Sequence, residues 1–88
     1  MQIDWNEEKN KELLETRGVG FEYVKHCIMS DAVMDTIEHH NTEKYSHQKV
    51  LVFEFKNYIY YCPFVKNWDT IFLKTIIPSR KLTKKYTI

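Results

Sequence analysis

The sequence predicts an α+β fold in which helices pack against a small antiparallel sheet. Residues 7–30 carry helical patterns, whereas residues 49–77 form three apolar, alternating segments separated by short polar turns. The chain has 88 residues, of which 43% are hydrophobic, and this suits about one core. Since no repeat, low-complexity run or Pro/Gly/Ser-rich linker occurs, residues 1–88 are expected to be a single domain.

The N-terminal third is expected to form a strand and two helices. Residues 2–5 (QIDW) are short and alternating, as in a strand. Residues 5–18 (WNEEKNKELLETRG) place acidic side chains in a first helical turn and end in glycine, which predicts a helix that stops at Gly18. Residues 21–30 (FEYVKHCIMS) carry an apolar stripe at helical spacing and predict a second helix. The side chains expected to face inward are Leu13, Leu14, Phe21, Val24 and Ile28.

The second half is expected to form a three-stranded antiparallel meander, preceded by a short strand within 33–37. Residues 49–55 (KVLVFEF), 58–65 (YIYYCPFV) and 71–77 (IFLKTII) predict strands because apolar and β-branched residues alternate in them. The KN pair after the first of these strands and the KNWDT segment after the second supply the turns. The strand at 2–5 joins the same sheet.

The chain is expected to end in a strand followed by a short basic helix. Pro78 and Ser79 end the strand, and Ser79 is a candidate N-cap for a helix over residues 80–86 (RKLTKKY). Strict alternation places Lys74 in mid-strand on a sheet surface, with Arg80 following at the exit of the strand. The two predicted faces of this strand are Ile71, Leu73, Thr75 and Ile77 on one side and Phe72, Lys74 and Ile76 on the other.

The charges are distributed unevenly, although the formal net charge is only +1. Residues 1–16 hold five carboxylates and two lysines, whereas residues 71–86 hold five cations and no carboxylate. A strand and a helix that present unopposed cations together favour contact with a polyanion. The alternative is an ordinary edge strand followed by a solvated helix, because single exposed cations are common. The five cations are Lys74, Arg80, Lys81, Lys84 and Lys85.

Candidate groups for chemistry lie in two places. Arg80, with its planar fork, and Lys74, close by, suit one phosphate and the charge that develops on it during reaction. The polar segment 39–48 carries imidazoles that can transfer a proton near neutral pH, although a solvated loop is the simpler interpretation. The histidine spacing matches no standard metal site, so no metal or other cofactor is expected. The candidates in the segment are His39, His40, Tyr45 and His47.

The remaining aromatic and thiol side chains are expected mainly in the core. The aromatics of residues 58–68, Trp68 included, are able to stack bases, but alternation on a small sheet buries most of them. Cys27 and Cys62 lack C-x-x-C spacing and have apolar neighbours, which predicts buried thiols. The chain shows neither a leader-like start nor about 18 consecutive apolar residues, so a cytoplasmic location without membrane contact is expected.

Two stretches, in order and at a suitable distance from each other, carry a resemblance to a known family. IDWNEEKNKELLETRGVGFEYV at 3–24 and IFLKTIIPSRKLTKKY at 71–86 resemble the BrnT toxins of bacterial type II toxin–antitoxin modules. The shared pattern is an acidic-aromatic start, a Lys-Asn helix, a Gly-hydrophobic-x-Phe-Glu break and a closing Ser/Arg/Lys/Thr/Lys run. The resemblance covers nearly the whole chain, from Ile3 to Tyr86.

The resemblance implies a RelE-like fold and a metal-independent ribonuclease that inhibits translation. The RNA then supplies its own nucleophile, while the enzyme supplies positioning, phosphate stabilisation and proton transfer. The resemblance also implies a partner, a cognate antitoxin with a ribbon-helix-helix DNA-binding part, in a hetero-oligomer that represses its own promoter.

The resemblance further assigns roles to particular residues. Arg80 falls on the arginine of the closing family motif, Lys74 on a basic position of the last strand, and Thr83 and Lys84 on the following Thr-Lys. In a subgroup of the family, a histidine follows the strand that comes after the second helix. This position favours His39 as the proton-transfer residue, and Tyr45 is the next candidate. The expected catalytic residues are therefore Arg80, Lys74 and His39, and the expected substrate-binding residues are Lys84, Lys81 and Tyr45.

The chain departs from the family pattern at two points. Pro78 stands where the larger branch of the family has a serine two residues before the arginine, and here Ser79 directly precedes Arg80. The TRG at 16–18 replaces a frequent KHG and removes a histidine.

Two other classes of function are compatible with the same cations. A non-catalytic module would use them to dock an acidic or amphipathic antitoxin segment, and this is the second choice after the ribonuclease. A plain nucleic-acid binder, a distant third, would bind RNA in a salt-sensitive way and leave it intact. Cleavage of RNA without added metal separates the first class from the other two.

Overall fold

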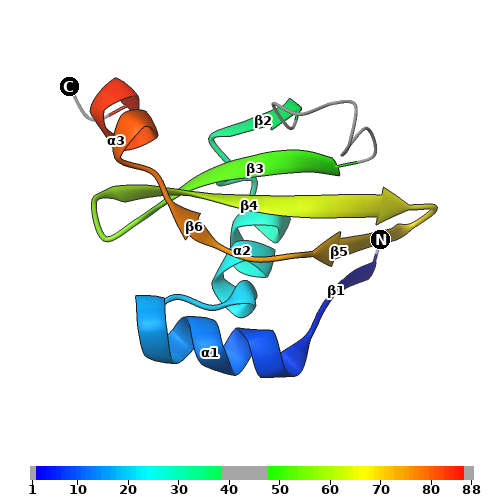
Figure 1. Ribbon diagram of the computed structural model, residues 1–88. Helices are drawn as coiled ribbons and strands as arrows, with labels where there is room; N and C mark the ends of the chain where they lie inside the picture. The colour runs from blue at the N-terminus through cyan, green and yellow to red at the C-terminus, as the bar shows by residue number, and fades with distance from the viewer. Residues whose placement is uncertain (1, 39–47, 87–88) are drawn as a thin grey trace.

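The computed structural model describes residues 2–38 and 48–86, and within these ranges it confirms the α+β class (Figure 1). None of the described helices combines the length and the apolar character needed to cross a membrane. The first half runs β1 (Gln2–Trp5), α1 (Glu7–Arg17), α2 (Phe21–Met29) and β2 (Asp35–Glu38). The second half runs β3 (Gln48–Phe55), β4 (Tyr58–Asn67), β5 (Thr70–Leu73), β6 (Ile77–Pro78) and α3 (Arg80–Tyr86).

The strands pair in the order β1-β5-β4-β3-β2, and β6 pairs with β4 as well. The predicted meander is confirmed, because β3, β4 and β5 pair antiparallel. However, β1 pairs parallel with β5, from Gln2 opposite Thr70 to Trp5 opposite Leu73, so the expectation of an antiparallel sheet is wrong at this edge. Parallel pairing needs a long crossover, and the chain between β1 and β5 supplies it.

Helix α1 begins and ends where the sequence indicates. The Asn6 side chain accepts a hydrogen bond from the Lys9 N–H at 3.0 Å and caps the first turn. Gly18 ends the helix at φ 73°, a left-handed conformation that glycine adopts without strain. Leu13 is buried as predicted, but Leu14 is 52% exposed. Successive helical residues point about 100° apart, so one narrow buried stripe does not hold both leucines.

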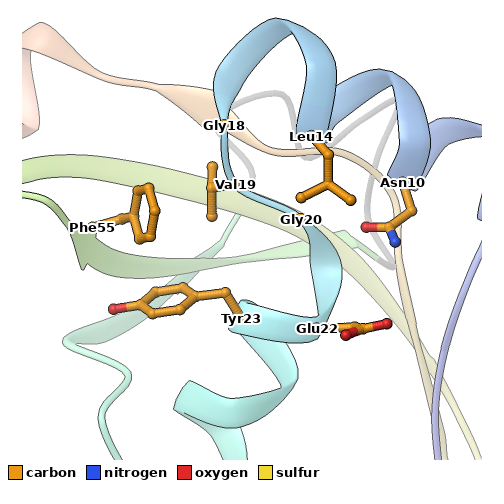
Figure 2. A pocket seen from close by; sticks show the side chains of 8 residues that line it. All are labelled: Asn10, Leu14, Gly18, Val19, Gly20, Glu22, Tyr23 and Phe55. Carbon is orange, nitrogen blue, oxygen red and sulfur yellow. The ribbon is translucent and has the colours of Figure 1, made fainter.

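A buried amide fixes the junction between α1 and α2. Asn10 is 4% exposed, and its Oδ1 accepts a hydrogen bond from the Phe21 N–H at 2.7 Å. Gly20 leaves room for this contact, because a Cβ there would lie 2.7 Å from the same oxygen. A pocket of about 200 Å³ opens beside the junction (Figure 2). It is lined by Asn10, Leu14, Gly18, Val19, Gly20, Glu22, Tyr23 and Phe55.

The core lies between the sheet and the two N-terminal helices, which cover one face of the sheet (Figure 1). Phe53 of β3 is fully buried, and its ring centroid lies 5.9 Å from that of Tyr23 and 5.8 Å from that of Tyr60. Ile28 packs only partly buried at the border of the core, whereas Cys27 takes a deeper position on α2. The most buried members are Leu13, Val19, Phe21, Val24, Phe53, Cys62, Leu73 and Ile76.

One extra residue between β5 and β6 changes which side chains face the core. Leu73 pairs with Phe64, and Ile77 pairs with Tyr61. Ile77 is thus four residues after Leu73, whereas the partners of these two residues on β4 are only three residues apart. An inserted residue of this kind turns the following side chains to the other face. Ile76 is accordingly fully buried in the core cluster. The strict alternation predicted for this strand is therefore wrong beyond Leu73.

Both cysteines are buried free thiols, as predicted. Burial raises the pKa of Cys62 to about 12 and also raises the pKa of Cys27 above its usual value. Both thiols therefore stay protonated near neutral pH, a state in which sulfur is a poor nucleophile.

Candidate nucleic-acid interface

Two hydroxyl side chains attach α3 to the edge of β4. The Ser79 Oγ accepts a hydrogen bond from the Leu82 N–H at 3.1 Å, so the predicted N-cap is confirmed. The Ser79 N–H donates to the Ile59 carbonyl at 2.9 Å, and the Ile59 N–H donates to the Thr83 Oγ1 at 2.9 Å. The Thr83 hydroxyl itself donates to the Ser79 carbonyl at 2.7 Å. Ser79 and Thr83 thus provide hydrogen-bond partners for the backbone N–H and carbonyl groups of Ile59 at the edge of β4.

This attachment leaves the cations of residues 74–85, called here the basic segment, at the surface. Leu82 and Thr83 are half-buried beside β4, whereas the cationic side chains are exposed. Arg80 and Lys84 are four residues apart on α3 and lie on the same side of it. Within 2–38 and 48–86 no carboxylate forms an ion pair with Lys74, Arg80, Lys81 or Lys84.

The sequence predicted Lys74 in mid-strand, and this is wrong. The extra residue between β5 and β6 interrupts the strand after Leu73. Lys74 directly follows β5, and its N–H donates to the Pro63 carbonyl at 2.8 Å. Its Nζ lies 5.2 Å from the ring centroid of Phe72, which is 37% exposed. Because Ile71 and Leu73 on either side of Phe72 belong to the core, Phe72 points to the opposite face of the sheet. The Lys74 ammonium therefore lies on the face that α1 and α2 leave uncovered.

The structure does not bring Lys74 and Arg80 to one point. Lys74 is fixed at Pro63, and Ser79, which precedes Arg80, is fixed at Ile59. These two positions on β4 are four residues apart, which corresponds to about 13 Å along an extended strand. The separation suits contacts to different phosphates of one nucleic-acid strand better than a shared contact to a single phosphate.

The proposed proton-transfer groups His39 and Tyr45, together with His40 and His47, lie outside the described residues. The described part of the chain contains one histidine, His26, which is exposed on α2. In the same part of the chain, no cluster of three or more His, Cys, Asp or Glu side chains is arranged to hold a metal ion. The described residues therefore supply phosphate-binding groups but no imidazole beside the basic segment.

A mixed set of charges, with glutamates in slight excess, lies on the other side of the molecule. Four exposed glutamates lie on α1, which covers the opposite face of the sheet from the Lys74 ammonium (Figure 1). Figure 1 also shows α3 at the far side of the sheet from α1. Since α1 also carries Lys9, Lys11 and Arg17, its net charge is −1, and the attraction of a polyanion rests on the basic segment and not on repulsion by α1. The glutamates are Glu7, Glu8, Glu12 and Glu15.

Sequence reasoning did not single out Phe72, whose ring carries the Lys74 ammonium on the face of the sheet opposite α1 and α2. Tyr61, one of the aromatics considered for base stacking, is half-buried on the same face, where it pairs with Val52 and Ile77. The signal that could have found Phe72 is its position between two core residues of a short strand.

Comparison of the chain with protein-family models, with curated proteins and with solved structures finds no significant match.

Replacing Thr83 by valine is expected to loosen α3. The change keeps the shape of the side chain but leaves the Ile59 N–H without its acceptor, and an unsatisfied donor that is partly buried costs about 1–3 kcal/mol. The free energy of unfolding in urea should fall by this amount with little change in its denaturant slope. Lys84→Ala changes the next residue, whose side chain is exposed, and should alter the free energy of unfolding by about 0.5 kcal/mol or less. Equal losses in the two variants would contradict the anchoring role of Thr83.

Proposed function

We propose that this protein is the toxin of a bacterial type II toxin–antitoxin system, a cytoplasmic, metal-independent ribonuclease with a RelE-like fold that inhibits translation. The observation that carries the proposal is the basic segment, whose cations are exposed and which is fixed to β4 by Ser79 and Thr83. The resemblance of 3–24 and 71–86 to BrnT toxins gives the proposal its class. A cognate antitoxin with a ribbon-helix-helix part neutralises the toxin by covering the basic segment in a hetero-oligomer.

The reaction in this proposal is an internal transfer at a phosphodiester. The 2′-oxygen of the RNA forms a bond to phosphorus, the bond from phosphorus to the 5′-oxygen breaks, and a cyclic phosphate remains on the first fragment. Arg80 donates two parallel hydrogen bonds to the non-bridging oxygens and stabilises the charge that they gain. Lys74 contacts a second phosphate and fixes the course of the strand. His39 or Tyr45 accepts the 2′-hydroxyl proton, and a proton goes to the leaving 5′-oxygen.

One observation favours the second function, a non-catalytic docking module. Among the described residues, the exposed cations of the basic segment lie beside the ring of Phe72, which is 37% exposed. Cations around an apolar side chain also suit an acidic, amphipathic antitoxin segment. In this function the protein neither cuts nor needs RNA.

The test is RNA cleavage by the purified chain in the presence of EDTA, with and without added ribosomes. The ribonuclease should yield fragments that end in 2′,3′-cyclic phosphate under at least one of these two conditions. A plain binder should retard the RNA on a native gel and leave it intact, and a docking module should do neither. Intact RNA in both conditions, with protein shown to be folded by circular dichroism, would overturn the proposed activity.

A further inference from the structure

Trp68 has an unusual environment for a tryptophan. It is 91% exposed, more than any other large hydrophobic side chain in the described residues. It lies in the turn between β4 and β5, and its backbone φ is 58°, a left-handed conformation that bulky residues rarely adopt. The fold thus gains almost no burial from this indole and tolerates backbone strain at the same residue. Both features point to a role outside the core.

The β4–β5 hairpin connects Trp68 to the basic segment. Lys66 is exposed near the end of β4, Phe72 lies on β5, and Lys74 follows β5 with its ammonium over the Phe72 ring. Two rings, Trp68 and Phe72, therefore lie between two cations, Lys66 and Lys74, along the hairpin. From Thr70, next to the turn, to Lys74 the chain advances about 13 Å if it is extended.

We propose that Trp68 is a base-stacking residue for single-stranded RNA that lies along β5 and the basic segment. The inference rests on the proposed function, because the same strand reaches Arg80. An indole with open faces accepts any base, since every base has a π face. The Phe72 ring already carries the Lys74 ammonium, so of the two rings Trp68 is the one whose faces are open. Trp68 thereby positions the RNA and does not touch the reacting atoms.

The surroundings of Trp68 favour a base over a protein partner. A tryptophan that anchors a protein interface normally lies within a patch that excludes water. The neighbours of Trp68 are the amide Asn67, the carboxylate Asp69 and, one residue further, the cation Lys66, and all three are exposed. A stacked base needs only an exposed ring face and nearby cations for the phosphates.

The test measures the affinity of a short, fluorescently labelled, fully 2′-O-methylated RNA, which has no free 2′-hydroxyl and stays intact. Trp68→Ala should weaken binding by about fivefold to a hundredfold, and Trp68→Phe should restore most of the affinity. The salt dependence should be unchanged in Trp68→Ala, because no phosphate contact is lost. Lys74→Ala should instead flatten the slope of log affinity against log salt by about one unit.

A spectroscopic measurement adds a readout that a structural role would not change. The chain has two tryptophans, so in a Trp5→Phe variant shown to be folded all indole emission comes from Trp68. The methylated RNA should quench this emission, whereas an abasic strand of the same length should leave it nearly unchanged.

The outcomes separate the stacking role from the proposed function. If the wild-type protein binds the RNA and Trp68→Ala binds equally well, the stacking role is overturned and the ribonuclease proposal stands. If the wild-type protein does not bind this RNA at all, RNA recognition itself fails.

Discussion

Arg80→Ala is expected to slow RNA cleavage about a hundredfold or more. Removing one positioned donor to a developing negative charge typically costs about 2.7–4 kcal/mol in the transition state. Arg80 is the first residue of α3, directly after the Ser79 cap, so its backbone is held in place while its side chain is exposed. The measurement is the single-turnover rate at saturating protein, which excludes effects of weaker binding.

Three variants make the Arg80 result specific. Arg17→Ala removes an exposed arginine at the end of α1 and should leave the rate unchanged. Arg80→Lys keeps the charge but loses the planar fork, so it should recover only part of the rate. Lys74→Ala should weaken binding and leave the rate at saturation almost unaltered. A wild-type rate in Arg80→Ala would remove Arg80 from the site.

Phe53→Ala is expected to lower the free energy of unfolding by about 3–5 kcal/mol. Phe53 is 0% exposed and lies between the rings of Tyr23 and Tyr60, so its removal leaves a cavity that the sheet and α2 do not close. Proteins of this size are stabilised by roughly 0.05–0.15 kcal/mol per residue, so this loss is a large part of the total. Urea unfolding should show a lower midpoint.

Phe72→Ala is the matched control on the other face of the sheet. Phe72 is 37% exposed, and the Lys74 ammonium lies 5.2 Å from its ring centroid, an interaction of about 0.5–1 kcal/mol at exposed sites. We expect Phe72→Ala to cost about 1 kcal/mol or less. Equal losses for Phe53→Ala and Phe72→Ala would contradict the assignment of the core to the helix-covered face.

Local periodicity and capping predicted most of the elements. The stop at Gly18, the meander and the Ser79 cap each depend on a few neighbouring residues, and all three are confirmed. The parallel pairing of β1 with β5 depends on segments that are distant in sequence, and alternation does not encode the direction of pairing. The buried Asn10 was missed because a polar residue on the inner face breaks the pattern from which burial is inferred.

The candidate site was predictable in composition but not in geometry. The cations of the basic segment are exposed, as their sequence pattern indicates. The predicted position of Lys74 was wrong because one extra residue interrupts the strand. The separation of Lys74 from Arg80 follows from backbone hydrogen bonds to β4, which no sequence pattern reveals. Trp68 was expected in a turn, but its near-complete exposure is visible only in the structure.

The most direct measurement of the central claim is induced expression of the chain in a bacterium, beside Arg80→Ala, with growth and RNA integrity followed together. A toxin ribonuclease with Arg80 in its site should cause growth arrest and loss of RNA, and Arg80→Ala should cause neither effect at equal soluble yield. Normal growth and intact RNA in cells that accumulate soluble wild-type protein would contradict this claim.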